Sequence, residues 1–262
     1  MKRVATGCSA LLALTLIGGL ACAHAALDLD APGGAGRYVA HAGGTADGRG
    51  YTNAREALDA SYARGYRLFE IDLSWTTDGH LVLMHDWEHV WPQFYSDSPG
   101  VPTLAGFRAT ESRLGLHQLT LTEFYAWLAE HADAYAITDA KERSEDALSV
   151  LANSPAEVRS RIVPQVYSPA EYQVARDLKF ERIVFTIYRS GMTSDAIIQF
   201  AETHDLWALT ISENSARHSD FSSLLARGRP PVFVHTINDP EYWRELRAAG
   251  FHGVYTDVLF ED

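Results

Sequence analysis

The chain has 262 residues, a formal net charge of −12 and two cysteines. The acidic excess repels nucleic acid and anionic membranes, which argues against both as partners. Both cysteines, Cys8 and Cys22, lie near the N-terminus, so the rest of the chain has no disulfide and no cysteine ligand for a metal. The length suits one large domain.

The first 25 residues have the pattern of a secretory signal peptide. The basic residues Lys2 and Arg3 precede the apolar run Leu11–Ile17. Ala23 and Ala25 are then small residues of the kind that signal peptidase recognises. The apolar run is shorter than the roughly 20 residues that a membrane span needs.

This pattern predicts cleavage after residue 25 and an exported protein, either periplasmic or secreted. The mature domain then comprises residues 26–262 and has no stable transmembrane segment. The alternative is a lipoprotein anchored through an acylated Cys22. Gly19 argues against it, because a lipobox normally has a larger aliphatic residue there. The sequence does not indicate the oligomeric state.

Beyond a flexible lead-in over residues 26–36, short apolar runs alternate with helical patterns. Helices are expected near residues 53–64, 121–132, 144–153, 169–177, 194–204, 219–227 and 240–249. The strand-like runs are Tyr38–His41, Leu68–Leu73, Tyr135–Ala140, Ile162–Tyr167, Ile183–Tyr188, Trp207–Ile211, Val232–Ile237 and Gly253–Thr256. Near-continuous apolar strands separated by helices indicate a parallel sheet buried on both faces. Eight of them predict a single, somewhat distorted (β/α)8 TIM barrel.

A ninth strand-like run, Leu81–His85, follows the second strand after the turn signal Thr76–Gly79. We interpret it as the return arm of a β-hairpin above the barrel mouth. Such a hairpin carries His85 back towards Glu70 and Asp72 and leaves the barrel with eight strands.

The longest irregular stretch, residues 87–118, is rich in aromatic side chains. It contains Trp87, Trp91, Phe94, Tyr95 and Phe107. An aromatic loop after a strand end is suited to wall a substrate pocket. A surface insertion with its own small apolar cluster is an equal alternative.

Polar residues follow the first three predicted strands. His41 closes the first, Glu70 and Asp72 close the second, and Asp139 and Lys141 close the third. In a (β/α)8 barrel the catalytic groups lie at the carboxyl ends of the strands. Side chains two residues apart on a strand point the same way, so each pair faces one site.

These residue types suit metal-assisted cleavage of a phosphate ester. Carboxylates without cysteine favour Mg²⁺ or Ca²⁺ over zinc, and a lysine can hold a phosphoryl oxygen. His41 and His85 can transfer protons near neutral pH. Taken singly, a histidine at a strand end is more often a hydrogen-bonded structural residue, and Glu-x-Asp is more often a salt-bridge pair. Their coincidence at successive strand ends favours a catalytic site.

In chain order, the motifs resemble those of the glycerophosphodiester phosphodiesterase family. The matching segments are His41-Ala-Gly43, Tyr51-Thr-Asn53, Glu70-Ile-Asp72, Thr76-Thr-Asp-Gly79, His85-Asp86, Asp139-Ala-Lys141, His235-Thr-Ile-Asn238 and Gly253-Val-Tyr-Thr-Asp257. The match runs over almost all of the mature chain. No single segment is specific, but the ordered set is. The constellation also resembles phosphatidylinositol-specific phospholipase C and sphingomyelinase D barrels.

The resemblance implies a distorted barrel that hydrolyses glycerophosphodiesters with one divalent cation. The implied acid–base pair is His41 and His85, and the implied metal ligands are Glu70, Asp72 and Asp139. Gln165 and Tyr167 are expected to contact the substrate because they end a predicted strand. The family motifs imply that Lys141, Asn53 and His235 also bind the substrate or its phosphate. Tyr188 also ends a predicted strand, and Asp257 either lines the pocket or holds a loop backbone.

Four residues depart from the family pattern. Ala42 replaces an arginine expected to help hold phosphate, and Thr52 replaces a glutamate beside Asn53. Asp139 shortens a metal ligand, and His235 replaces a tryptophan. Each change alters a wall of the phosphate or alcohol pocket, so the sequence predicts the reaction class rather than the head group.

We therefore predict an exported, metal-dependent phosphodiesterase acting on a small phosphodiester or a phospholipid-derived substrate. One alternative is a lipid phosphodiesterase or lyase of phospholipase C or D type that forms a cyclic phosphate. The other is a non-catalytic barrel that binds a phosphorylated or carbohydrate ligand. The intact histidines and carboxylates weigh against this second alternative, and Ala42 and Thr52 weigh for it.

Overall fold

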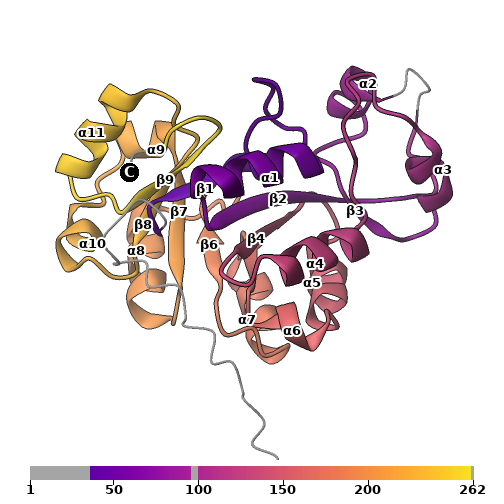
Figure 1. The fold of residues 1–262 in the computed structure, drawn as a ribbon. Helices are drawn as coiled ribbons and strands as arrows, with labels where there is room; N and C mark the ends of the chain where they lie inside the picture. Colours follow the sequence, from indigo (N-terminus) through magenta and orange to yellow (C-terminus); the bar gives the residue numbers. More distant parts are fainter. Residues whose placement is uncertain (1–35, 96–99, 261–262) are drawn as a thin grey trace, which may run out of the picture.

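Nine strands form one sheet that closes into a barrel (Figure 1). The computed structural model describes residues 36–95 and 100–260, so the predicted signal peptide and Cys22 lie outside the described residues. The strands run in the order β1-β9-β8-β7-β6-β5-β4-β2-β3, and an additional β1–β2 pairing closes a ring of eight. All pairings within the ring are parallel. The predicted (β/α)8 barrel is confirmed.

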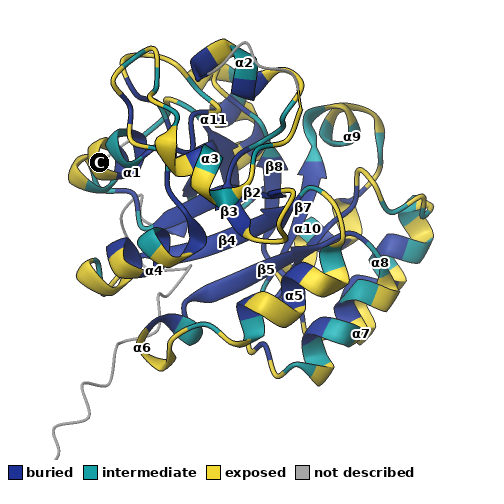
Figure 2. Cartoon of the chain, turned by 90° about the vertical axis from the view of Figure 1, so that its right-hand side faces the viewer, coloured by how far each residue is buried: buried dark blue, intermediate teal, exposed yellow. Residues whose placement is uncertain are grey.

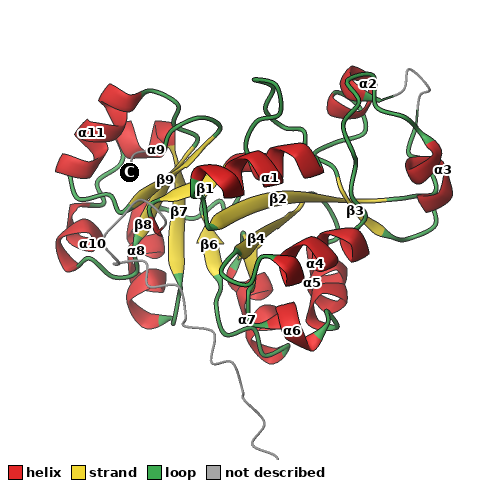
Figure 3. Ribbon diagram, in the orientation of Figure 1, coloured by secondary structure: helices red, strands yellow, loops and turns green. Residues whose placement is uncertain are grey.

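Helices and strands alternate along the chain (Figure 3), and their bounds lie close to the predicted runs. The strands are β1 (Tyr38–Ala40), β2 (Leu68–Trp75), β3 (Leu81–Leu83), β4 (Tyr135–Ala140), β5 (Ile162–Val166), β6 (Val184–Thr186), β7 (Ala208–Ser212), β8 (Val232–His235) and β9 (Gly253–Thr256). The helices are α1 (Arg55–Arg64), α2 (Val90–Phe94), α3 (Leu104–Ala109), α4 (Leu121–Glu130), α5 (Ser144–Ala152), α6 (Ala156–Arg159), α7 (Pro169–Asp177), α8 (Ser194–Thr203), α9 (Glu213–His218), α10 (Ser222–Arg227) and α11 (Pro240–Ala248).

The differences from the prediction are local. The short helices α2, α3, α6 and α9 were not expected, because four to six residues are too few for a clear helical period. His41 was placed in the first strand, but it begins a 3-10 turn instead. The turn arises because Ala42 has a left-handed φ of 49°, which ends the extended backbone.

Burial explains why the strands read as continuous apolar runs. Every residue of β2, β4 and β5 is buried, and exposed positions concentrate on the helices of the outer layer (Figure 2). One or two side chains from each barrel strand form a separate apolar cluster: Val39, Leu68, Tyr135, Ile137, Val163, Val184, Ala208, Phe233 and Tyr255. Alternate residues of a strand share a face, so Glu70 and Asp72 continue the row begun by Leu68. The cluster therefore fills one end of the barrel interior and leaves the other end to polar side chains.

The β2–β3 hairpin extends beyond the ring. Strand β2 continues past the barrel and pairs antiparallel with β3, with Leu73 opposite Leu83 and Trp75 opposite Leu81. The chain then enters the region of α2 and α3, which lies beside the hairpin (Figure 1). Its aromatic residues pack with residues of β3 in a cluster of their own: Val82, Met84, Val90, Trp91, Phe94, Tyr95 and Phe107, with Trp87 packed against it. In the part of the chain that the structure describes, no helix is long and apolar enough to cross a membrane.

Candidate active site and metal centre

Three carboxylates meet inside the barrel mouth. Glu70, Asp72 and Asp139 are buried, and each offers an oxygen within 4.8 Å of the others. The register of the sheet explains this, because Asp72 on β2 is the direct partner of Asp139 on β4. Glu70 lies two residues earlier on β2 and therefore points the same way.

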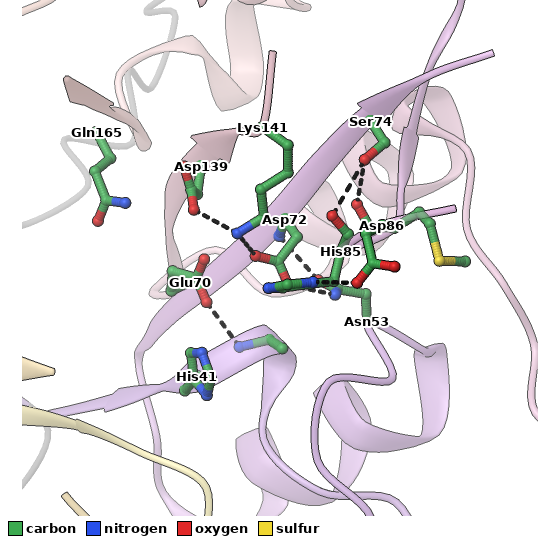
Figure 4. Close-up of polar contacts among 12 residues, drawn as sticks. His41, Asn53, Glu70, Asp72, Ser74, His85, Asp86, Asp139, Lys141 and Gln165 are labelled. Atoms are coloured by element: carbon green, nitrogen blue, oxygen red, sulfur yellow. Dashed lines mark hydrogen bonds and ion pairs between the residues drawn. The ribbon is translucent and has the colours of Figure 1, made fainter. Parts of the chain in front are cut away.

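A single lysine bridges two of these carboxylates. Lys141 Nζ lies 2.5 Å from Asp72 Oδ1 and 2.6 Å from Asp139 Oδ2. Figure 4 shows the lysine side chain reaching between the two aspartates, with Glu70 beside them. One ammonium group thus faces three buried carboxylates, and the cluster has an excess of negative charge when all of them are ionised.

The charge excess changes how these groups titrate. Burial and the adjacent Asp72 charge raise the pKa of Glu70 to about 8. Burial also acts to raise the pKa of Asp72, but the charges of Lys141, His85 and His41 together are among the effects that outweigh it, so this pKa is lowered. Burial acts to lower the pKa of Lys141, but Asp72 and Asp139 outweigh it, so this pKa is raised. A positive charge added beside Glu70 would stabilise its ionised form.

Neighbouring groups fix the orientation of each carboxylate. The Asn53 side chain donates from Nδ2 to Asp72 Oδ2 at 2.7 Å, and its Oδ1 accepts from the Asp72 backbone N–H at 2.9 Å. Glu70 Oε2 accepts from the backbone N–H of Ala42 at 2.8 Å. Ala42 has a positive φ and lies in the 3-10 turn that follows β1. This turn directs the backbone N–H of Ala42 towards Glu70.

Asp139 is held by a chain of hydrogen bonds from β5. The Tyr167 hydroxyl donates to Asp139 Oδ1 at 2.6 Å, and Gln165 Nε2 donates to the Tyr167 hydroxyl oxygen at 2.7 Å. Both side chains were predicted to contact the substrate. In the structure they lie behind Asp139 and are absent from the cavity lining, so the geometry favours a supporting role.

His41 is joined to the opposite end of the chain. Its Nδ1 lies 2.9 Å from Asp257 Oδ1, and Asn238 donates to the other oxygen, Asp257 Oδ2, at 2.6 Å. Burial acts to lower the pKa of His41, but the hydrogen bond to Asp257 and the charge of Glu70 are among the effects that outweigh it, so the pKa is raised. With Nδ1 engaged, Nε2 is the nitrogen available for proton transfer.

His85 is delivered by the hairpin, as predicted. The backbone N–H of Met84 donates to the Asp72 carbonyl at 3.0 Å, which anchors the return arm against β2. His85 Nδ1 lies 2.7 Å from Asp86 Oδ2, and Asp86 Oδ1 accepts from the backbone N–H of Glu88 at 3.0 Å. Asp86 is thereby fixed and orients the imidazole.

Tyr51 stands between the two histidines. Its ring meets His41 edge-on at a centroid distance of 4.8 Å and His85 at 5.1 Å. The residue has a φ of 62°, and its side chain is 41% exposed although it contacts both imidazoles. The ring therefore covers the space between the histidines from the solvent side.

A cavity of about 500 Å³ joins these groups. It is lined by His41, Tyr51, Glu70, His85, Asp139, Lys141, Tyr188, Arg189, Ser212 and His235. A second cavity of about 720 Å³ shares His85 and Lys141 with it and extends under Trp87, Pro92 and Val101. The aromatic insertion thus has its own apolar cluster and also contributes a wall next to the candidate site.

His235 lines the cavity from β8, as the sequence predicted. Its ring stacks on Tyr188 at a centroid distance of 5.7 Å and meets His41 edge-on at 4.8 Å. Burial and the positive charges of His41 and Lys141 lower the pKa of His235 to about 3. This imidazole is therefore neutral across the physiological range and can accept or donate a hydrogen bond.

The structure brings the predicted residues together and adds three others. His41, Glu70, His85, Asp139, Lys141 and His235 line the cavity, whereas Asn53, Gln165 and Tyr167 support its carboxylates. Sequence reasoning gave no role to Tyr51 or Arg189 and left that of Asp257 open. Arg189 directly follows the predicted strand Ile183–Tyr188, so the strand-end rule could have identified it.

The carboxylate cluster fits a divalent cation. Its donors are all oxygens, its ligand atoms converge, and its negative charge exceeds what Lys141 balances. Hard cations such as Mg²⁺ and Ca²⁺ prefer this donor set. Glu70, Asp72 and Asp139 are the residues that would hold the ion.

Comparison with known proteins gives a consistent result. The model of the glycerophosphoryl diester phosphodiesterase family matches residues 41–259. No curated protein is similar enough to count as a match.

Solved structures of similar proteins share the fold. A glycerophosphodiester phosphodiesterase from Parabacteroides distasonis has 17% identity and a TM-score of 0.66, covering 84% of this chain and 92% of its own. One from Thermotoga maritima has 19% identity and a TM-score of 0.63, covering 84% and 93%. An Oleispira antarctica phosphodiesterase, solved with the product sn-glycerol-3-phosphate, has 18% identity and a TM-score of 0.65, covering 84% and 92%.

The metal centre can be tested without an activity assay. We expect Mg²⁺ or Ca²⁺ to raise the melting temperature of the protein, because a ligand at 100 times its Kd adds about 2.7 kcal/mol to the free energy of unfolding. Asp139→Asn should abolish this rise. The control Asp133→Asn, at an exposed carboxylate paired with Arg67, should keep it. An equal rise in all three proteins would exclude the carboxylate cluster as the binding site.

Proposed function

Because the chain belongs to the glycerophosphoryl diester phosphodiesterase family, a family of phosphodiester hydrolases, we propose that it is a metal-dependent enzyme hydrolysing small glycerophosphodiesters to an alcohol and glycerol phosphate. One observation carries the proposal: three buried carboxylates converge to form an oxygen-only group that could hold a metal, and two of them, Glu70 and Asp139, line the same cavity as two carboxylate-paired histidines. The signal-peptide pattern of the first 25 residues supports an exported location for the protein.

The residues divide the chemistry between them. A divalent cation at Glu70, Asp72 and Asp139 would supply positive charge to the non-bridging oxygens of the phosphate. Lys141 forms ion pairs with Asp72 and Asp139 and holds these two carboxylates beside each other. Tyr51 limits the access of water between the histidines.

The two histidines differ in their surroundings, which favours different roles. His41 is buried and has Asp257 behind it, so it is oriented to accept a proton from the nucleophile, either water or a neighbouring substrate hydroxyl. His85 lines both cavities, so it stands where the leaving group passes from the metal centre into the second cavity. We assign His41 as the general base and His85 as the general acid.

A second candidate function follows from the second cavity. Its apolar wall, formed by Trp87, Pro92 and Val101, suits a leaving group larger than glycerol, including the lipid portion of a phospholipid-derived diester. Lipid phosphodiesterase activity through a cyclic phosphate is therefore the alternative to test.

Hydrolysis assays separate the candidates. We expect turnover of glycerophosphocholine that EDTA abolishes and Mg²⁺ or Ca²⁺ restores. Lysophosphatidylcholine and phosphatidylinositol are assayed in parallel, with ³¹P NMR to detect cyclic phosphate. Turnover of only the lipid diesters would favour the second candidate. No chelator-sensitive turnover of any diester would favour a binding protein.

The assignment of acid and base predicts different responses to the leaving group. We expect His41→Ala and His85→Ala each to reduce turnover of glycerophosphocholine by about 10²–10⁴-fold. With a p-nitrophenyl diester, whose leaving group needs no proton, His85→Ala should recover most of its activity and His41→Ala should not. The exposed His218→Ala serves as the control. Near-normal turnover of glycerophosphocholine by His85→Ala would refute the assignment.

The partner of His41 predicts a change in pH dependence. Asp257 raises the pKa of His41, so Asp257→Asn should lower it. A general base must be deprotonated, and the acid limb of kcat/KM should therefore move to lower pH. A hydrogen bond to a charged group contributes about 1.5–3 kcal/mol, which corresponds to a shift of about one to two pH units.

The control for this measurement is Asp205→Asn. Asp205 is an exposed carboxylate that pairs with Arg176 and does not line the cavity. Its pH profile should match that of the unmodified protein. An unchanged acid limb in Asp257→Asn would show that His41 does not set this limb.

A further inference from the structure

Arg189 is a cation of the cavity that the mechanism above does not use. It follows β6 and lines the same cavity as His41, His85 and Lys141. Its guanidinium carbon lies 4.3 Å from the centroid of the Tyr167 ring, and Nη2 donates to the carbonyl of Lys141 at 3.3 Å. These two contacts hold the guanidinium group at the cavity wall.

In the described residues, the positive charge of Arg189 has no carboxylate partner. Lys141 is bound by two aspartates, whereas within residues 36–95 and 100–260 no carboxylate lies within ion-pair distance of Arg189. A guanidinium group has five N–H donors, and the contacts of Arg189 with the Lys141 carbonyl and the Tyr167 side chain use only part of them. The remaining donors have the fork geometry that binds two oxygens of a phosphate.

Stacking alone does not account for this arrangement. Arg217 also stacks on a tyrosine, with its guanidinium 3.8 Å from the Tyr242 ring. Arg217, however, pairs with Glu213 at 2.7 Å and is absent from the cavity lining. Arg189 combines the same stacking with a place in the lining of the cavity that also contains Glu70 and Asp139.

We propose that Arg189 binds a non-bridging phosphoryl oxygen of the substrate and of the phosphate-bearing product. The proposal rests on the proposed function for the identity of the substrate, but the predicted ligand chemistry is any phosphate group at the cavity. The position next to His41 carries Ala42, which has no cationic side chain. Strand β6 stands opposite β1 in the ring, so Arg189 supplies positive charge from across the barrel.

Calorimetric titration with inorganic phosphate and with glycerol 3-phosphate, in the presence of Mg²⁺, tests this directly. We expect Arg189→Gln to weaken binding of both ligands by about 10- to 100-fold, as is typical for a lost hydrogen bond to a charged group. Arg189→Lys should retain part of the affinity, because it keeps the charge but loses the fork. The matched control Arg217→Gln should bind as the unmodified protein does.

Two further readouts separate phosphate binding from a structural role. If the proposal holds, added guanidinium ion restores phosphate binding to Arg189→Ala, and the melting temperature of the variants matches that of the unmodified protein. In assays of glycerophosphocholine, KM of Arg189→Gln rises more than kcat falls. Unchanged phosphate affinity in Arg189→Gln, or equal losses in Arg217→Gln, would overturn the proposal. Failure of the unmodified protein to hydrolyse any diester would overturn the proposed function alone, because the phosphate titration is independent of turnover.

Discussion

The ion pairs of Lys141 with Asp72 and Asp139 are the interaction on which the site depends. Transferring charged groups from water to a protein interior is costly unless partners compensate. One ammonium group compensates two carboxylates, while the Ala42 N–H, Asn53 and Tyr167 hold the oxygens that it does not reach. The cluster still has more negative than positive charge. That imbalance suits the barrel mouth to bind a cation rather than to form a closed salt-bridge network.

Barrel closure places His41 beside this cluster, and the hairpin adds His85. Because β1 lies between β2 and β9 in the ring, His41 stands next to Glu70 on one side and Asp257 on the other. His85 comes from outside the ring, where the extended β2 turns back through β3. One histidine is therefore fixed by the barrel and the other by the hairpin, which explains their different exposure.

Local sequence patterns predicted the carboxylates and histidines because their positions follow from strand periodicity. A residue at a strand end points into the barrel mouth, and its i+2 neighbour shares that direction. The same rule does not specify how deep a side chain lies: Tyr167 donates to Asp139 and Gln165 donates to Tyr167, and their contact with the substrate stays a prediction. The pairing of His41 with Asp257 spans almost the whole chain and arises only when the ring closes. Tyr51 reaches the site through a loop with positive φ, which carries no periodic signal.

The ring order also separates the groups proposed for the reaction from the wall that faces them. The groups assigned to chemistry come from β1, the β2–β3 hairpin, β4 and the end of β9, which are contiguous in the sheet. The facing wall, from β6 to β8, carries Tyr188, Arg189, Ser212 and a neutral His235. In the described residues, none of these side chains forms an ion pair with Lys141 or Asp72, although Arg189 donates to the Lys141 carbonyl and the Tyr188 hydroxyl contacts that of Tyr167. We therefore expect substitutions in that wall to change selectivity for the phosphate and its alcohols more than they change the carboxylate cluster or the two histidines.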